Sequence, residues 1–375
     1  MSNTERLTIL TTPSNEDGVR IHIEKMVEQR SKEMDLLLKQ LPHLETAIEQ
    51  LETGNADLVA MSAFDWKKFN SPDLIISAIL PRREPTWVLV CDDKPEYLIS
   101  GALVICDQPL IKRQLYRLRD DLHIVSTSEF ISLNQIDKSL EEMDQVEKIS
   151  WLEDCRQEER IDGFITTRSL HSSLKFKSRR HTLGLQRESP ERTHFIPPPL
   201  HGFTLLVARK GFPINKVATM NDEAASVCHR IESNLYDSLD LKLRPIVGIF
   251  VEQRKIGTII REAERSNDDL TLESVISTEG KLNSSEIRIQ MTIETLSSDG
   301  KVTAMCERII PIEKSHMGMV TILKEFNFLI GVMQKEHEEL VRVIAGMPES
   351  YKNSKKAILK LDDHSDSSIE LPDEP

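Results

Sequence analysis

The sequence predicts an α/β protein with two doubly wound α/β domains and a smaller α+β domain at the C-terminus. In the first half of the chain, short apolar runs alternate with helical stretches, as in repeated strand–helix units. The last third instead combines an Asp-Gly hairpin signal with one long helical pattern. The length of 375 residues suits two or three domains of ordinary size.

In the first half, apolar runs bounded by turn residues are typical of buried strands. These predicted strands are Leu7–Thr12, Asp57–Met61, Leu74–Leu80, Trp87–Cys91, Ala102–Cys106, Leu122–Val125, Gly163–Thr166 and, further on, Phe203–Arg209. Helical periodicity predicts a long helix over Asp17–Leu41, a second over Leu44–Glu52 that stops at Gly54, and a third over Leu110–Leu118.

The segment between Arg168 and Arg192 has a different character. It carries seven bases and two acids, has no apolar periodicity, and is followed by the prolines at 197–199. We therefore expect a mobile connection between domains.

The last third predicts a helix over Asp222–Leu239 and two strand pairs. Val247–Glu252 is expected to pair with Lys255–Glu262 about a tight turn. Ile287–Leu296 is expected to pair with Lys301–Ile310 through Ser298-Asp299-Gly300, because Asp-Gly supplies the positive φ values of a hairpin turn. A long amphipathic helix is predicted over Met317–Ile344.

Composition excludes several classes of function. A net charge of −13 weighs against a nucleic-acid-binding surface, and no apolar run is long enough for a membrane-spanning helix. The N-terminus is polar and lacks a signal-peptide core, so a cytoplasmic protein is expected. The five cysteines are scattered without a CxxC pair and the histidines do not cluster, which argues against disulfides and metal sites. Residues 361–375 carry six acids and no Lys or Arg, and the tail over 351–375 is expected to be disordered.

Several segments, in order, resemble the porphobilinogen deaminase (hydroxymethylbilane synthase) family. The clearest is Leu74–Val90 (LIISAILPRREPTWVLV), similar to the family's strand, Leu-Pro-Arg, acid, Pro, strand run. Gly54–Trp66 (GNADLVAMSAFDW), Asp162–Leu170 and Phe195–Arg209 (FIPPPLHGFTLLVAR) resemble other family segments. The likeness covers about 7–350, although each motif is degraded.

The resemblance implies two periplasmic-binding-protein-like domains around a cleft. Domain 1 would comprise 1–93 and 194–215, domain 2 would comprise 98–190, and the C-terminal domain would span 216–350. The family belongs to tetrapyrrole (haem) biosynthesis: it condenses four porphobilinogens into a linear tetrapyrrole and releases ammonia. It uses a carboxylate, a cationic cleft, and a cysteine thioether to a dipyrromethane cofactor.

Asp65 occupies the position of the family's catalytic aspartate, which accepts pyrrole N–H groups and transfers protons. Ser62 and Ser14 match family serines and are implied to bind substrate. The family's neighbouring Lys and His are Phe64 and Met61 here. Taken alone, an aspartate at a strand end is more often a structural cap.

Fewer cationic residues match the implied cleft than the family has. Lys112-Arg113 resembles the family's Arg-Arg at a helix start and is implied to bind substrate carboxylates, with an ordinary solvated helix face as the alternative. Arg168 is a candidate to replace one of the lost arginines. Lys242 occupies the position expected for the cofactor cysteine, so covalent attachment of dipyrromethane is doubtful.

Two functions follow from these residues. The first is a divergent hydroxymethylbilane synthase with a degraded active site, acting on porphobilinogen or a related anion. The second is an inactive paralogue that binds a small anion or a tetrapyrrole, or serves as a scaffold. Solute binding in the periplasm is disfavoured because no export signal is evident. Residues 254–285 look like additional material relative to the family, and no feature predicts an oligomeric state.

Overall fold

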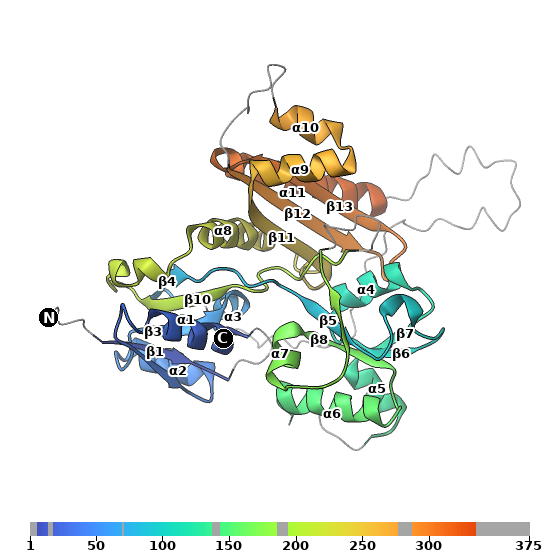
Figure 1. The fold of residues 1–375 in the computed structure, drawn as a ribbon, viewed down its shortest axis with the longest axis horizontal. Helices are drawn as coiled ribbons and strands as arrows, with labels where there is room; N and C mark the ends of the chain where they lie inside the picture. Colours follow the sequence, from blue (N-terminus) through green and yellow to red (C-terminus); the bar gives the residue numbers. More distant parts are fainter. Residues whose placement is uncertain are drawn as a thin grey trace, which may run out of the picture.

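The first sheet of the computed structural model is formed by both early and late parts of the chain (Figure 1). Residues 6–13, 18–69, 71–136, 143–185, 194–276 and 287–334 are described. The strand order is β2-β1-β3-β10-β4, with β10 antiparallel between β3 and β4. These strands are β1 (Leu7–Thr11), β2 (Leu36–Gln40), β3 (Leu58–Ser62), β4 (Leu74–Ile79) and β10 (Thr204–Arg209). The helices of this domain are α1 (Val19–Arg30), α2 (Leu44–Glu52) and α3 (Ala63–Lys68).

The second sheet has the order β7-β6-β8-β5-β9, so the two sheets are of the same doubly wound type. Its strands are β5 (Trp87–Val90), β6 (Leu103–Ile105), β7 (His123–Val125), β8 (Gly163–Thr167) and β9 (Arg180–Leu183). Its helices are the 3₁₀ turn η1 (Pro95–Tyr97), α4 (Pro109–Leu118), α5 (Thr127–Leu133), α6 (Gln145–Gln157) and α7 (Arg168–Ser173). A capping box formed by Asp144 and Glu147 fixes the start of α6.

The C-terminal domain is a three-stranded antiparallel sheet with helices on it. Its strands are β11 (Val247–Lys255), β12 (Ile287–Leu296) and β13 (Thr303–Pro311). Its helical elements are α8 (Glu223–Asp237), η3 (Arg244–Ile246), α9 (Ile256–Ser266), α10 (Asp269–Val275), η4 (Ile312–Lys314) and α11 (Ser315–Gln334), whereas the preceding η2 (Ile214–Met220) packs in the core of the first sheet. The mixed α/β fold class predicted from the sequence is therefore confirmed.

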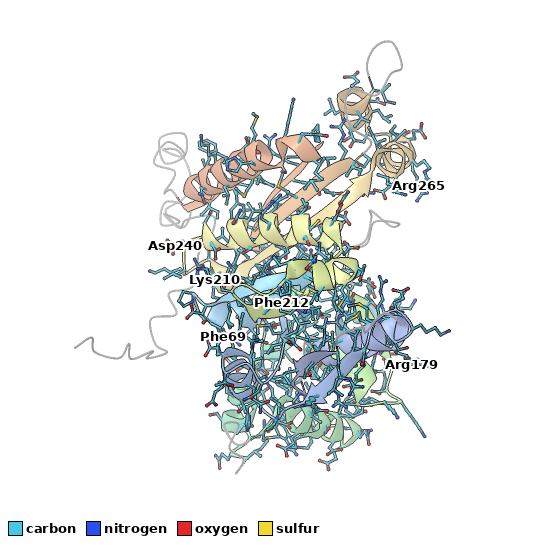
Figure 2. The ribbon with its side chains drawn as sticks, turned by 90° about the vertical axis from the view of Figure 1, so that its left-hand side faces the viewer. Phe69, Arg179, Lys210, Phe212, Asp240 and Arg265 are labelled. Carbon is cyan, nitrogen blue, oxygen red and sulfur yellow. The ribbon has the colours of Figure 1, made fainter. Side chains whose placement is uncertain are left out.

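The hydrophobic core joins the first and C-terminal domains. One cluster runs from α2 and the first sheet through α8 to all three C-terminal strands and α11. Figure 2 shows α8 lying between the C-terminal sheet and the first domain. By contrast, the second domain has its own clusters on the two faces of its sheet. The second domain is thus the part with the more independent core.

Several boundaries differ from the predicted ones. The expected helix over Asp17–Leu41 ends at Arg30, because Leu36–Gln40 pairs in parallel with β1 and becomes an edge strand. The segment beginning at Arg168 is not a plain connection: it forms α7, and β9 then pairs with β5. These two strands depend on partners distant in the sequence, which local periodicity does not reveal.

Two further predictions are corrected. Lys255–Glu262 is not a strand paired with Val247–Glu252, because β11 continues to Lys255 and the chain then enters α9. The first-domain boundary at 93 is too late, since β5 lies in the second sheet. By contrast, the Asp-Gly hairpin between β12 and β13 is confirmed, with Gly300 at φ +70°. Of the helix predicted over Met317–Ile344, residues up to Gln334 belong to α11, and the remainder, like the acidic tail, lies outside the described residues.

Candidate functional site at the domain crossing

Four strand ends meet at one edge of the first sheet. Because β1, β3 and β4 run in the same direction, their carboxyl ends lie together, and antiparallel β10 brings its amino end to the same edge. Ser62 at the end of β3 is paired in register with Thr204 at the start of β10. In open α/β sheets this edge is the usual place for ligands.

Asp65 lies at this edge in the first turn of α3. The Ser62 hydroxyl donates to Asp65 Oδ2 at 2.8 Å, and the Asp65 backbone N–H donates to Ser62 Oγ at 2.9 Å. Lys68 Nζ lies 2.9 Å from Asp65 Oδ1, and the Asp65 side chain keeps 28% of its surface exposed. The carboxylate is therefore held in one orientation but remains accessible.

Two chain segments pass between the first and second domains beside this edge: one contains Arg83 and leads from β4 to β5, and the other contains Gly202 and leads from β9 to β10. We call this place the crossing. The two segments are hydrogen-bonded to each other, since the Arg83 N–H donates to the Gly202 carbonyl at 3.1 Å. The Arg83 guanidinium donates to Ser169 Oγ of α7 at 3.1 Å. Gly18, with φ +63°, packs against the same pair, because a Cβ there would lie 2.6 Å from Ser169 Oγ. Arg83 thus connects the start of α1 to the second domain.

His22 of α1 contributes a neutral group to the crossing. Its Nδ1 lies 3.0 Å from Thr204 Oγ1. Burial, with the nearby cations Arg83 and Lys25, lowers the pKa of His22 to about 4. The ring is therefore uncharged at neutral pH.

The second-domain side of the crossing carries Arg168 at the start of α7. Its Nη1 lies 3.2 Å from Glu84 Oε2, and both side chains are largely exposed. Asp107, ahead of α4, accepts from the backbone and hydroxyl of Thr127 and pairs with Lys148 at 2.6 Å. Burial alone would raise the pKa of Asp107, but Lys148 and Thr127 hold it below its ordinary value. Asp107 therefore adds a negative charge at the start of α4.

The two predicted cations of α4 have different surroundings. Lys112 is half-buried, and its side chain makes no hydrogen bond or ion pair within the described ranges. Arg113 is only 3% exposed, and its Nη1 donates to the Leu296 carbonyl at 2.5 Å. This guanidinium therefore contacts the C-terminal sheet rather than an open cleft.

The residues after Arg113 complete this contact with β12. Gln114 donates to Glu294 Oε1 at 3.0 Å and to the Ile196 carbonyl at 2.9 Å. Arg117 Nη1 lies 2.6 Å from Glu294 Oε2. One helix thus docks the second domain on the C-terminal domain, as its place in Figure 1 also shows.

Lys242 is exposed in the loop between α8 and η3, where its backbone N–H donates to Asp240 Oδ1 at 3.0 Å. Figure 2 labels Asp240 of this loop. Burial raises the pKa of the thiols of Cys91, Cys106 and Cys228 to about 12, and it also raises that of Cys306. Cys155 is buried as well. Four of the thiols thus have a raised pKa and the fifth is buried, which is opposite to the exposed, low-pKa thiol that a thioether-linked dipyrromethane needs, so these residues do not fit that cofactor.

Ser14, also predicted to bind substrate, lies outside the described residues. The sequence reasoning missed Arg82, His22 and Arg83. Arg82 donates to both carboxylate oxygens of Glu232 and to the carbonyls of His201 and Val251. It also lies over the rings of Phe203 and Phe250, at 4.0 and 4.7 Å from their centroids. The Leu-Pro-Arg-Arg run was the available signal, but it does not reveal which partners the two arginines meet.

Comparison with known proteins gives a distant relative. The chain is 23% identical over 214 residues to a probable porphobilinogen deaminase of Picrophilus torridus. The alignment covers 57% of this chain and 66% of that protein, just under two thirds of its length. No protein-family model matches the chain.

Among solved structures, the chain is similar to the periplasmic aliphatic sulphonate binding protein SsuA of Escherichia coli. The identity is 12%, the TM-score is 0.31, and the match covers 72% of this chain and 76% of SsuA. The VFT2 domain of Bordetella pertussis BvgS, as a double mutant, gives 15% identity and a TM-score of 0.32, with 58% and 85% covered. A putative methionine-binding lipoprotein of Bacillus subtilis gives 11% and 0.32, with 58% and 91% covered.

Within the described part of the chain, no helix is long and apolar enough to cross a membrane. The same residues contain no group of three or more His, Cys, Asp or Glu side chains placed to hold a metal ion.

Proposed function

We propose that this chain is a divergent relative of porphobilinogen deaminase that binds porphobilinogen, or a linear tetrapyrrole derived from it, at the domain crossing. The observation that carries the proposal is the position of Asp65. Its carboxylate lies at the carboxyl edge of the first sheet, is oriented by Ser62, and remains partly exposed. The distant likeness to a probable porphobilinogen deaminase supports the same proposal.

Asp65 has the chemistry that the condensation requires. A carboxylate accepts hydrogen bonds from pyrrole N–H groups and stabilises the positive charge that develops on the pyrrole when ammonia leaves. Ser62 occupies one lone pair of Oδ2 and fixes the orientation of the carboxylate. Lys68 Nζ contacts the other carboxylate oxygen, Oδ1, at 2.9 Å and so also constrains the orientation of the Asp65 side chain.

The acetate and propionate groups of the ligand need cations near the crossing. We assign this role to Lys112 and Arg168. Lys112 has no ion-pair partner within the described ranges, and the exposed Arg168–Glu84 pair opens at little cost. We assign a positioning role to Arg113, because its guanidinium already contacts Leu296.

The second candidate is a protein that binds the same ligand without catalysis. The exposed Lys242 at the expected cysteine position, together with five buried or half-buried thiols, favours it. An enzyme of this family extends a covalently held primer, and the chain lacks a suitable thiol for one.

Intact-mass spectrometry of the purified protein, combined with an assay for hydroxymethylbilane formation, separates the candidates. Product formed from porphobilinogen without a covalent adduct supports a synthase with a non-covalent primer. Saturable binding of porphobilinogen or a linear tetrapyrrole without product supports the non-catalytic binder. If the protein neither binds nor converts either compound, the proposed function is wrong.

A further inference from the structure

A hollow on the second domain lies away from the crossing. Its volume is about 570 Å³, and its lining comes from the end of α6, the turn after β5, and the segment that links α7 to β9. The lining residues are Asp92, Glu153, Arg156, Gln157, Lys175, Phe176, Lys177, Ser178 and Arg179. Because β5 runs from Trp87 at the crossing toward Asp92, its length separates the hollow from the crossing. The volume falls within the range of small-molecule sites, roughly 300–1,000 Å³.

The acids of the hollow are already neutralised. Arg156 donates to both oxygens of Glu153 at 3.0 and 2.9 Å and pairs with Asp92 at 3.0 Å. Gln157 Nε2 donates to Glu153 Oε1 at 3.0 Å. Burial would raise the pKa of Glu153, but Arg156 and Gln157 keep it below its ordinary value. Glu153 therefore remains ionised and fully engaged with the residues beside it.

The remaining cations have no acidic partner. The side chains of Lys175 and Lys177 make no hydrogen bond or ion pair within the described part of the chain, and Arg179 Nη1 reaches only the Asp92 carbonyl, at 3.4 Å. All three side chains are exposed, and Figure 2 labels Arg179 at the periphery of the molecule. The three cations repel one another, so their grouping opposes folding locally. Such a grouping stands out in a chain whose net charge is −13.

The spacing of these cations suggests what they bind. Lys175 lies in the turn after α7 with a left-handed φ of +53°, and Lys177 and Arg179 follow within four residues, so all three cations lie on one short segment of the lining. A ligand with one anionic group would meet only one or two of them. A ligand with several such groups would meet all three, and Phe176 and Ser178 would supply an apolar wall and a hydroxyl.

We propose that this hollow is a second ligand site, which binds a small molecule carrying two or more phosphate or carboxylate groups. The site is distinct from the crossing and does not depend on the proposed function. Phosphates and carboxylates share the chemistry that the three cations recognise, so the source of the anionic groups is decided by experiment.

Titration calorimetry with the full-length protein tests the proposal. The probes are inorganic triphosphate and citrate, each measured against sodium chloride of equal ionic strength. The test variant is K175Q/K177Q, whose two side chains are exposed and make no described contact, so folding should be preserved. The matched control is K39Q/K94Q, which removes two exposed lysines outside the hollow.

We expect at least one probe to bind the unmodified protein and the control with equal affinity, and to bind K175Q/K177Q at least tenfold more weakly. Binding of triphosphate alone would identify phosphate as the anionic group, and binding of citrate alone would identify carboxylate. Equal affinity for all three proteins would place the anion elsewhere, for example at the crossing, and would overturn the proposal. Failure of both probes to bind would overturn it as well. None of these outcomes depends on porphobilinogen turnover, so the test is independent of the proposed function.

Discussion

Arg82 and Glu232 form the most deeply buried ion pair of the residues discussed. The Glu232 side chain has no exposed surface and also accepts backbone N–H groups from Leu200 and Val251. Burial raises the pKa of the Glu232 carboxyl, against the effect of Arg82 beside it. The pair joins the crossing to α8 and β11, so its loss should affect both domains.

We predict that Glu232→Gln lowers the free energy of unfolding by about 3–5 kcal/mol, because Arg82 would remain buried without a charge partner. Urea denaturation measures this change. The control is Glu84→Gln, which breaks the exposed pair with Arg168 and should cost under about 1 kcal/mol. Equal losses in the two variants would contradict the assigned role of the buried pair.

His229 of α8 gives a pH-dependent prediction. Burial, with Lys67 and Arg82 nearby, lowers the pKa of His229 to about 4. The unfolded chain would bind a proton near the ordinary pKa of 6.5. Stability should therefore fall as the pH drops from about 6.5 toward 4, by up to about 3 kcal/mol from this residue.

His229→Phe removes the titrating ring and keeps an aromatic contact with Phe203, whose ring centroid lies 5.4 Å away. We expect the loss of unfolding free energy between pH 7 and pH 4 to be smaller in this variant. An unchanged pH dependence in urea titrations would show that His229 does not contribute.

At the scale of elements, the contact of α4 with the C-terminal hairpin determines how the second domain sits. The tip of the hairpin packs against the backbone of α4, because a Cβ at Gly300 would lie 2.6 Å from the Arg113 carbonyl oxygen. Gly211 also has a positive φ, but no atom lies within 4 Å of a Cβ there. A substitution at Gly211 therefore introduces backbone strain alone, whereas the same substitution at Gly300 adds a clash between two domains.

We predict that Gly211→Ala costs about 1–2 kcal/mol, which is the strain of the left-handed conformation alone. Gly300→Ala should cost about 1–3 kcal/mol more, because α4 has to move away from the hairpin. Hydrogen exchange should also show faster exchange of the α4 amides only in Gly300→Ala. Equal effects in both variants would mean that the hairpin does not hold α4.

Some helices and strands can be predicted from the sequence, and others cannot. The hairpin at Gly300 and the helices α2 and α4 were predictable, because turn chemistry and apolar periodicity are local signals. Strands β2 and β9 were not predictable, since each is an edge strand that exists through its pairing with β1 or β5. The turn of β11 into α9 was misread because Lys255–Glu262 carries apolar residues compatible with either structure.

The candidate site likewise has features that the sequence predicts and features that it does not. The place of Asp65 after β3 was predictable from its position behind an apolar run, and the structure adds its bonds to Ser62 and Lys68. The surroundings of Arg113 were not predictable, because they depend on β12, which lies far away in the sequence. Cationic side chains look alike in a sequence whether they contact solvent, a ligand or another domain.

For the whole molecule, the arrangement of three sheets decides what can move (Figure 1). The first and C-terminal domains share a hydrophobic cluster, whereas the second domain is joined to them by two crossing segments and by α4. We therefore expect any closure around a ligand at the crossing to be a movement of the second domain. The ligand would then lie between Asp65 on one side and Lys112 and Arg168 on the other.

The measurement that tests this account most directly is porphobilinogen binding and turnover by the unmodified protein, Asp65→Asn and Asp73→Asn. Asp65→Asn keeps an acceptor for Ser62 but removes the charge, whereas Asp73 is an exposed carboxylate of the same domain. We predict that Asp65→Asn lowers turnover by about 10²–10⁴-fold, or weakens ligand binding at least tenfold if the protein only binds, with an unchanged melting temperature. Asp73→Asn should match the unmodified protein. Equal binding and turnover in all three proteins would contradict a ligand site at Asp65.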